Sequence, residues 1–303
     1  MKSKIFYKYK SCVGELSDRN SNFYHLIDSL RNKYLYLTRP ENLNDKDECK
    51  LFNNYNASND DIRKWLENHP CLVEVIKKKF PKKDLVCVVR KYIQKSVKFR
   101  RQMDICVQEE REHFHIFSLT ENPKNDKMWN IYAECFSVVC FGYEAKNILT
   151  ENDCFDFSDK DFRYFIEISD DISGVDGFWL KQNNKYYLGV VNVKYAKRTP
   201  LKCKVFRLYD EEEKQKIRDS FLVKNNTATN GMTDWSYEQE SRIILLDYHF
   251  PREEKIDLMI HYPDHVLKEV WFGHNIDCQK KQMVKNCIID NYTNNFDIKF
   301  KTF

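Results

Sequence analysis

Glycine and proline are scarce in this sequence, and long hydrophobic runs are absent. Each of the two residue types occurs only seven times in 303 residues, with no internal repeat and no low-complexity linker. No apolar run is long enough to cross a bilayer, and the segment 1–6 lacks the apolar core of a signal peptide. We therefore expect a globular, cytoplasmic chain that neither enters a membrane nor is secreted.

The sequence also lacks cysteine pairs with the spacing of a metal or redox site. Its eleven cysteines are spread singly, without a CxxC, which favours buried thiols in a reducing compartment over a disulfide framework or a zinc ribbon. The close histidines His113 and His115 alternate with Phe114 as in a strand, so we predict no metal site. The net charge of +4 is small for this length and does not by itself indicate nucleic-acid binding.

Length and pattern together predict one large α+β domain over 1–303. Short β-branched and aromatic runs indicate strands, which we expect to form a mixed, mostly antiparallel sheet. The stretch 55–112 is helical in pattern throughout, and we expect it to be an insertion or a helical lobe within that domain.

The helical lobe is rich in basic residues. Candidate nucleic-acid contacts within it are Lys91, Lys98, Arg100 and Arg101. Such a cluster is commonly a solvated helix face, and it is alternatively an electrostatic footprint for RNA, DNA or another anionic partner. Aromatic residues are not interleaved with the basic ones as in a stacking platform, and both interpretations stay open.

The segment 235–246 combines a strand pattern with an unusual set of charges. Aromatic and β-branched residues predict one strand from Trp235 onward, so that Glu238, Glu240 and Arg242 share a face with Ser236. The two carboxylates would then lie about 7 Å apart. An exposed ion pair of Arg242 with Glu240 explains the pattern, and so does a functional site in an apolar neighbourhood.

Polar and aromatic residues at the ends of other expected elements are further candidates. The strand 4–9 ends in Lys8 and Tyr9, and Ser118 closes the strand 113–119. The loop with Asn44 and Asp45 has the composition of a structural Asx turn.

A helix that begins at Asn125 places Trp129 and Tyr132 one turn apart, on the same side. Packing in the core explains such a pair, and for at least one of the two rings we expect it to be the explanation.

These segments, taken in order, resemble a bacterial family known as the domain of unknown function numbered twenty-nine seventy-one. The motifs that carry the resemblance span nearly the whole chain: Tyr7-Lys8-Tyr9, Leu43-Asn44-Asp45, Phe117-Ser118-Leu119, Met128-Trp129-Asn130-Ile131-Tyr132-Ala133, Val193-Lys194-Tyr195, Trp235-Ser236-Tyr237-Glu238-Gln239-Glu240-Ser241-Arg242 and Trp271-Phe272-Gly273. The chain departs from the family at Lys46, where proline is usual, and at Ile116, where cysteine is frequent.

The order of motifs is also similar, more weakly, to ADP-ribosyltransferases of the Glu-x-Glu class. Lys8 stands where that class has an arginine on its first strand, and Ser118-Leu119-Thr120 stands in the place of its serine motif. The resemblance implies that Glu240 stabilises the positive charge that develops when the nicotinamide–ribose bond of NAD breaks. It implies that Glu238 deprotonates the acceptor.

The same resemblance implies roles for the remaining candidates. Lys8, next to Tyr9, would hold a phosphate or ribose, and Ser118 would support Glu240 or the ribose by hydrogen bonding. Trp129 or Tyr132 would stack on nicotinamide. Arg242 would orient a carboxylate.

The function that this resemblance favours is an NAD-consuming enzyme, with NAD as substrate. It would be a transferase or a glycohydrolase, acting as a toxin or an anti-phage defence effector with nucleic acid or protein as acceptor.

Two other functions stay open at this point. In a metal-dependent nuclease, Asp234, Glu238 and Glu240 would ligate Mg²⁺, although Ser241 and Arg242 stand where a nuclease lysine usually follows. In a non-catalytic interaction module, the polar rows would be structural and the basic block would bind the partner.

Overall fold

The computed structural model describes residues 2–43, 52–131, 137–148, 164–196, 202–208, 210–213, 216, 223–225, 235–247 and 258–303, and the structural statements below concern these residues. The chain divides into two compact units. The first comprises Met1–Asn42, Phe114–Val193 and Gly231–Phe303, and the second comprises Leu43–His113 and Lys194–Asn230. Each unit is described by itself.

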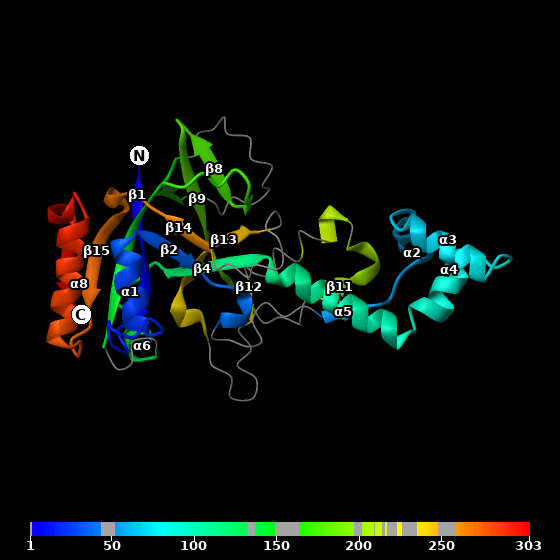
Figure 1. Cartoon of the computed structure of the whole chain (residues 1–303), viewed down its shortest axis with the longest axis horizontal. Coiled ribbons are helices and arrows are strands. Elements are labelled where there is room, and N and C mark those ends of the chain that lie inside the picture. Colours follow the sequence, from blue (N-terminus) through cyan, green and yellow to red (C-terminus); the bar gives the residue numbers. More distant parts are fainter. Residues whose placement is uncertain are drawn as a thin grey trace. The chain divides into compact units, whose positions relative to one another are not determined.

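Six strands of the first unit close into a barrel with antiparallel neighbours throughout (Figure 1). In order around the barrel they are β1 (Ser3–Ser11), β4 (Phe114–Thr120), β13 (Glu240–Leu246), β9 (Lys185–Asn192), β6 (Tyr164–Ile168) and β5 (Val138–Lys146), which pairs again with β1. The prediction of a mixed, mostly antiparallel sheet is therefore confirmed.

At two corners of the barrel, neighbouring strands pair through a single residue pair. β1 pairs with β4 only at Tyr7 and Thr120, and β5 pairs with β6 only at Lys146 and Phe165. The barrel is thus two sheets joined at their corners. One is β4-β13-β9-β6, and the other is β1-β5 extended by β15 (Leu267–Phe272) and the parallel strand β16 (Lys299–Thr302).

Further elements complete the first unit. They are α1 (Asn22–Arg31), β2 (Tyr34–Leu37), η1 (Pro40–Asn42), α6 (Asp126–Ile131), β7 (Asp176–Gly177), β8 (Trp179–Gln182), η4 (Trp235–Glu238), β14 (Leu258–His261), η5 (Asp264–Val266), α8 (Cys278–Asn291) and η6 (Asn295–Asp297). The two longer helices begin at side chains that accept backbone hydrogen bonds, Ser21 for α1 and Asp277 for α8.

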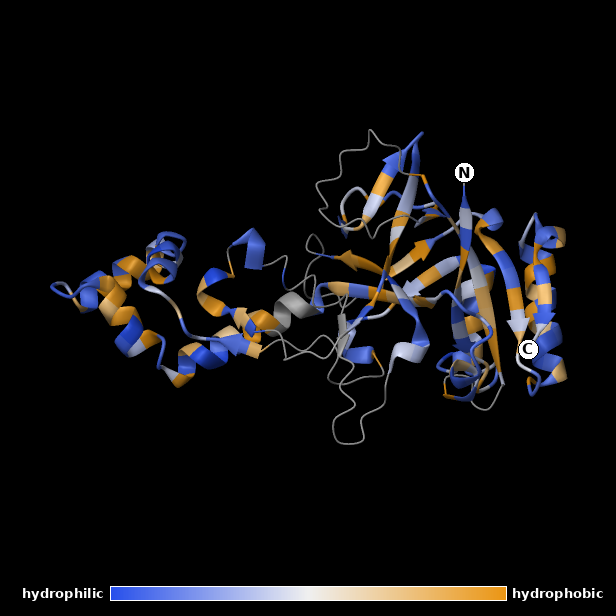
Figure 2. Cartoon of the chain, turned by 180° about the vertical axis from the view of Figure 1, so that it is seen from behind, coloured by the Kyte–Doolittle hydropathy of each residue, from blue (hydrophilic) through white to orange (hydrophobic). Residues whose placement is uncertain are grey.

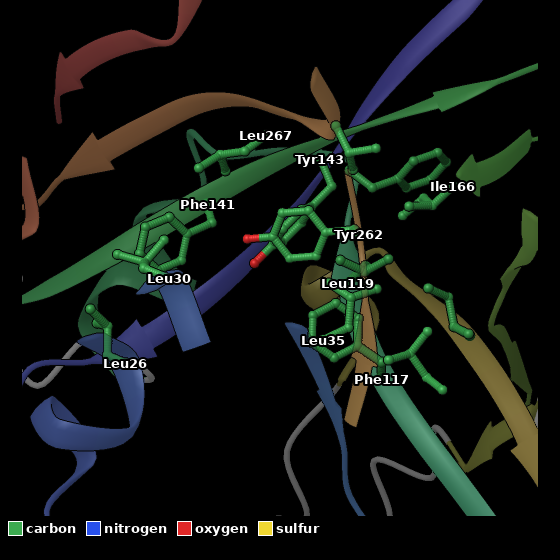
Figure 3. Packing of buried hydrophobic residues seen from close by; sticks show 14 of the residues in the cluster. Leu26, Leu30, Leu35, Phe117, Leu119, Phe141, Tyr143, Ile166, Tyr262 and Leu267 are labelled. Carbon is green, nitrogen blue, oxygen red and sulfur yellow. The ribbon is translucent and has the colours of Figure 1, made fainter. Parts of the chain in front are cut away.

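One large apolar core joins the strands to these two helices. Strand alternation places Phe117 and Leu119 of β4 on the same face, and both are buried in a cluster with Leu30 of α1 and Phe141 of β5. Figure 3 shows these side chains gathered in the core. Burial of each such side chain stabilises the fold by about 1.5–3 kcal/mol.

The second unit is mainly helical. Its elements are β3 (Phe52–Asn54), α2 (Asn59–Glu67), α3 (Pro70–Lys79), α4 (Leu85–Val88), η2 (Val89–Ile93), α5 (Val97–Glu112), β10 (Lys194–Ala196), β11 (Lys202–Lys204), η3 (Val205–Arg207) and β12 (Val223–Asn225). The helices carry hydrophobic and hydrophilic residues side by side along their length (Figure 2). The apolar positions form a separate small core, in which Trp65 contacts Phe99 and Phe206 edge-on and the rings of Phe99 and Phe206 are tilted to each other.

Two features of the second unit differ from expectation. Apolar residues at helical spacing from Leu85 to Cys106 predict one long helix after Pro81, whereas the structure has α4 and the π-helical turn η2, then a break before α5. At this break the side-chain amide of Gln94 donates to the backbone carbonyl of Tyr55. Arg100 Nε donates to the backbone carbonyl of Gln94 at 3.2 Å. The unit also takes in chain from 194–230, beyond the 55–112 lobe.

Among the helices of the described residues, none combines the length and apolar composition that a bilayer crossing requires.

Candidate active site

The segment that begins at Trp235 is not a strand over its whole length. Residues 235–238 form the 3₁₀-helix η4, Gln239 has a left-handed backbone (φ +46°), and β13 begins only at Glu240. The prediction of one continuous strand, with Glu238 and Glu240 on one face, is therefore wrong. The cause is a set of contacts from residues far away in the sequence. Thr120 Oγ1 donates to the Glu238 carbonyl at 2.8 Å, and the side-chain amide of Asn125 donates to the Tyr237 carbonyl.

Glu240 and Arg242 form a buried, two-pronged ion pair at the start of β13. Arg242 Nε donates to Glu240 Oε1 at 2.8 Å, and Nη2 donates to Oε2 at 3.0 Å. The two side chains are only 6% and 1% exposed. Removing two charges from water is costly, and a parallel pair of charge-assisted hydrogen bonds is the geometry that best offsets this cost. The explanation by an exposed surface pair is therefore wrong.

Two hydroxyl groups of the neighbouring strand lie on the same face as this ion pair. In the antiparallel register, Glu240 is opposite Thr120 and Arg242 is opposite Ser118, so the four side chains point to one side of the sheet. Ser118 is half-buried, whereas the other three residues are buried. Ser118 is therefore the most exposed of the four residues.

Lys8 lies at the corner where the two sheets separate. Beyond Tyr7, β1 continues to pair with β5 and no longer with β4, and Lys8 Nζ lies 5.1 Å from the ring centroid of Phe117. Removal from water lowers the pKa of the Lys8 ammonium. Glu240 and Glu238 act in the opposite direction, and Arg242 lowers the pKa further. The charges of Glu238, Glu240 and Arg242 are thus near enough to influence the ammonium of Lys8.

Trp129 does not face a substrate site. Its side chain is fully buried, stacked on Phe303 at 5.1 Å and edge-on to Tyr9 at 5.1 Å. Trp129 Nε1 and the Tyr9 hydroxyl both donate to the Pro123 carbonyl, at 2.7 and 3.2 Å. This burial agrees with the expectation that at least one of the two rings packs in the core, and Tyr9 contributes to the same packing.

Three other candidates, Tyr132, Asn44 and Asp45, lie outside the described residues, as does Asp234. The basic candidates Lys91, Lys98, Arg100 and Arg101 belong to the second unit, on η2 and α5, and are exposed.

The structure also contains a buried carboxylate with three hydrogen-bond donors, which the sequence did not indicate. We call Glu269 and these donors the Glu269 cluster. Glu269 of β15 is 6% exposed and accepts hydrogen bonds from Tyr7 at 3.0 Å, Trp271 at 2.9 Å and Lys301 at 2.7 Å. Trp271 carried one of the family motifs. No local pattern links it to Tyr7, because only the fold brings β1 and β15 to the two sides of β5.

His115 serves another buried pair, and its Nε2 lies 2.8 Å from Asp247 Oδ2. Within the described ranges, no three histidine, cysteine, aspartate or glutamate side chains are grouped so as to hold a metal ion.

Comparisons with known proteins do not identify the chain: no family model, no curated protein and no solved structure gives a significant match.

Proposed function

We propose that the chain is an NAD-consuming enzyme, an ADP-ribosyltransferase or NAD glycohydrolase, with Glu240 at its reacting centre. The observation that carries the proposal is the carboxylate of Glu240, held in one orientation by Arg242 and flanked by the hydroxyl-bearing residues Ser118 and Thr120. A pre-oriented carboxylate is what a developing ribosyl cation requires, because stabilisation is greatest when no reorganisation is needed.

The chemistry is that of glycoside cleavage. The bond between the ribose C1′ and the nicotinamide nitrogen breaks, and its electron pair leaves with neutral nicotinamide. Positive charge develops on the ribose, where Glu240 stabilises it. Water or an acceptor nucleophile then bonds to C1′ and loses its proton, for which Glu238 is the proposed base.

We assign the remaining residues to the diphosphate and ribose groups of NAD. Lys8 is a cationic group at the corner of the sheets, where the charge of Glu240 raises its pKa, and is the proposed contact for a phosphate. Ser118 is the half-exposed hydroxyl on the Glu240 face and is the proposed ribose contact. Arg242 is a positioning residue for Glu240.

The test is nicotinamide release from NAD by the purified chain, alone and with total bacterial RNA, DNA or lysate protein. Glu240→Gln is expected to lower the rate by about 100-fold or more, and Ser118→Ala is expected to lower it less. ADP-ribosyl transfer moves the adenylate half of NAD onto the acceptor. With NAD labelled in that half, label retained on RNA, DNA or protein therefore identifies the acceptor class.

The matched control is Glu269→Gln, which removes an equally buried carboxylate outside the proposed site. Circular dichroism confirms that each variant is folded at the assay temperature. The proposal fails if the folded chain releases no nicotinamide under any condition, or if Glu269→Gln loses as much activity as Glu240→Gln.

A further inference from the structure

Two aromatic rings stack on each other at the surface of the second unit. Phe80 follows the last residue of α3, and Tyr92 lies in η2. Their centroids are 5.3 Å apart with an interplanar angle of 14°. Phe80 is half-buried, whereas Tyr92 is 42% exposed. Phe80 packs against the core of the second unit, and Tyr92 presents aromatic surface to solvent.

Three lysines surround this stack. Lys83 Nζ lies 5.2 Å from the Phe80 centroid and 5.5 Å from that of Tyr92. Lys91 Nζ lies 5.5 Å from Tyr92, and Lys79 Nζ lies 6.0 Å from Phe80. Lys83 and then Lys91 lower the pKa of the Tyr92 phenol, which reflects the local positive field. We call Phe80, Tyr92, Lys79, Lys83 and Lys91 the Tyr92 surface.

The charge around the Tyr92 surface is strongly of one sign. The segment 76–101 contains eleven lysines and arginines against one acidic residue, Asp84, a formal charge of +10 in a chain whose total is +4. None of the ion pairs found among the described residues involves Lys79, Lys83 or Lys91. These three charges are therefore available to an anionic partner.

Not all basic residues of the segment are available in this way. Arg90 Nη2 donates to Asn59 Oδ1 at 2.6 Å and to the Ala57 carbonyl at 3.2 Å. Arg100 Cζ lies 5.1 Å from the ring centroid of Tyr55, and Arg100 Nε donates to the Gln94 carbonyl at the break before α5. Both arginines hold the unit together, so the sequence-based choice of Arg100 as a nucleic-acid contact is revised.

We propose that the Tyr92 surface binds single-stranded nucleic acid, with an unpaired base stacked on Tyr92 and phosphates held by Lys79, Lys83 and Lys91. Exposed aromatic faces beside lysines are the combination that single strands require, because every base has a face to stack and every nucleotide a phosphate. The sequence indicated the basic residues but not the aromatic stack, because Phe80 and Tyr92 are twelve positions apart and meet only in the folded unit.

The experiment measures fluorescence anisotropy of labelled 20-nucleotide oligo(U), oligo(dT) and a duplex of equal length, against the full chain and without NAD. The expected result is salt-dependent binding of a single strand in preference to the duplex. The two single-stranded probes distinguish RNA from DNA, and preference for either supports the proposal. Since no turnover is measured, failure here leaves the NAD proposal untouched, and a failed NAD assay leaves this one untouched.

Three variants separate stacking from charge. Tyr92→Ala is expected to weaken binding at least about fivefold while the dependence on salt is unchanged. Tyr92→Phe retains the stack and is expected to bind as the parent does. The double variant Lys83→Gln with Lys91→Gln is expected to lower the slope of log affinity against log salt by about 1.4, since each phosphate contact to a single strand contributes about 0.7.

The control for charge is Lys2→Gln with Lys299→Gln, which removes two exposed lysines of the first unit. It is expected to leave binding nearly unchanged. The proposal is overturned if the folded chain binds no single strand at about 100 μM in low salt. It is also overturned if Tyr92→Ala binds as the parent does, or if heparin and phosphatidylserine vesicles bind with the same affinity, because then charge alone is recognised.

Discussion

The phenol of Tyr7 donates a hydrogen bond of 3.0 Å to Glu269 Oε2 from a strand on the far side of β5. β5 lies between the two strands, and Gly142 of β5 is the residue opposite both Tyr7 and Glu269 in the register. The bond crosses above the glycine, which has no side chain to obstruct it.

Gly142→Ala tests this close approach. A Cβ at Gly142 would lie 2.8 Å from Ile5 Cγ2, 2.9 Å from Tyr7 Cε1 and 3.1 Å from Glu269 Cβ. We expect a loss of about 1–3 kcal/mol in the free energy of unfolding, because packed neighbours must move. Urea denaturation measures the loss. Gly174→Ala is the control, since a Cβ there meets no atom within 4 Å. Equal effects at both glycines would contradict the argument.

Glu269→Gln tests the hydrogen bonds around Glu269 through the pH dependence of the free energy of unfolding. Burial raises the pKa of Glu269, but hydrogen bonds from Lys301, Trp271 and Tyr7 together outweigh burial, and the net shift is downward. A carboxyl group with a depressed native pKa stabilises the fold above its ordinary pKa, and this contribution is lost as pH falls through the native pKa.

The variant is therefore expected to be less stable than the parent at pH 7 by about 1–3 kcal/mol. The difference should persist at pH 5 and shrink below about pH 4.3, the ordinary pKa of glutamate. Urea denaturation of both proteins at pH 7, 5 and 3.5 measures it. A difference that grows on acidification would show that the cluster is not held by an ionised Glu269.

Substitutions at Glu240 and Arg242 test the buried ion pair. Glu240→Ala removes both acceptors from a guanidinium that is 1% exposed, and we expect a loss of about 3–5 kcal/mol in stability. The double variant Glu240→Leu with Arg242→Met removes both charges and is expected to be more stable than Glu240→Ala. A double-mutant cycle measured by chemical denaturation gives the coupling. Additive losses would mean that the two side chains do not depend on each other.

The regular strands could be predicted from the sequence, because their signal is local. The expected strand 4–9 lies within β1, and the expected strand 113–119 corresponds to β4. In both, apolar and β-branched residues recur at the spacing that a sheet imposes.

The candidate site could be predicted only in part. Glu240, Ser118 and Lys8 were identified from motifs, but the orientation of Glu238 was not, because η4 is fixed by Thr120 and Asn125 from more than a hundred positions away. The same holds for Trp129, whose burial depends on Phe303 at the opposite end of the sequence.

Lys10→Met tests the positive charge of a half-buried lysine near the end of β1. Removal from water, and then the neighbouring charge of Lys8, lower the pKa of Lys10 to about 8. Because this native pKa lies below that of the unfolded chain, the native state binds fewer protons between about pH 8 and 10.4, and stability rises with pH across that window. Below pH 8 the destabilising effect of the charged amine is present in full.

At pH 7 we expect Lys10→Met to stabilise the chain by about 1–3 kcal/mol, less than the full linkage value because the side chain is only half-buried. Urea denaturation at pH 7 and pH 9.5 measures the gain, which should be smaller at the higher pH. Lys299→Met, at an exposed position of β16, is expected to change stability by less than about 0.5 kcal/mol at both pH values. A Lys10→Met variant that is less stable than the parent at pH 7 would show that the amine of Lys10 is favourably solvated or paired in the native chain.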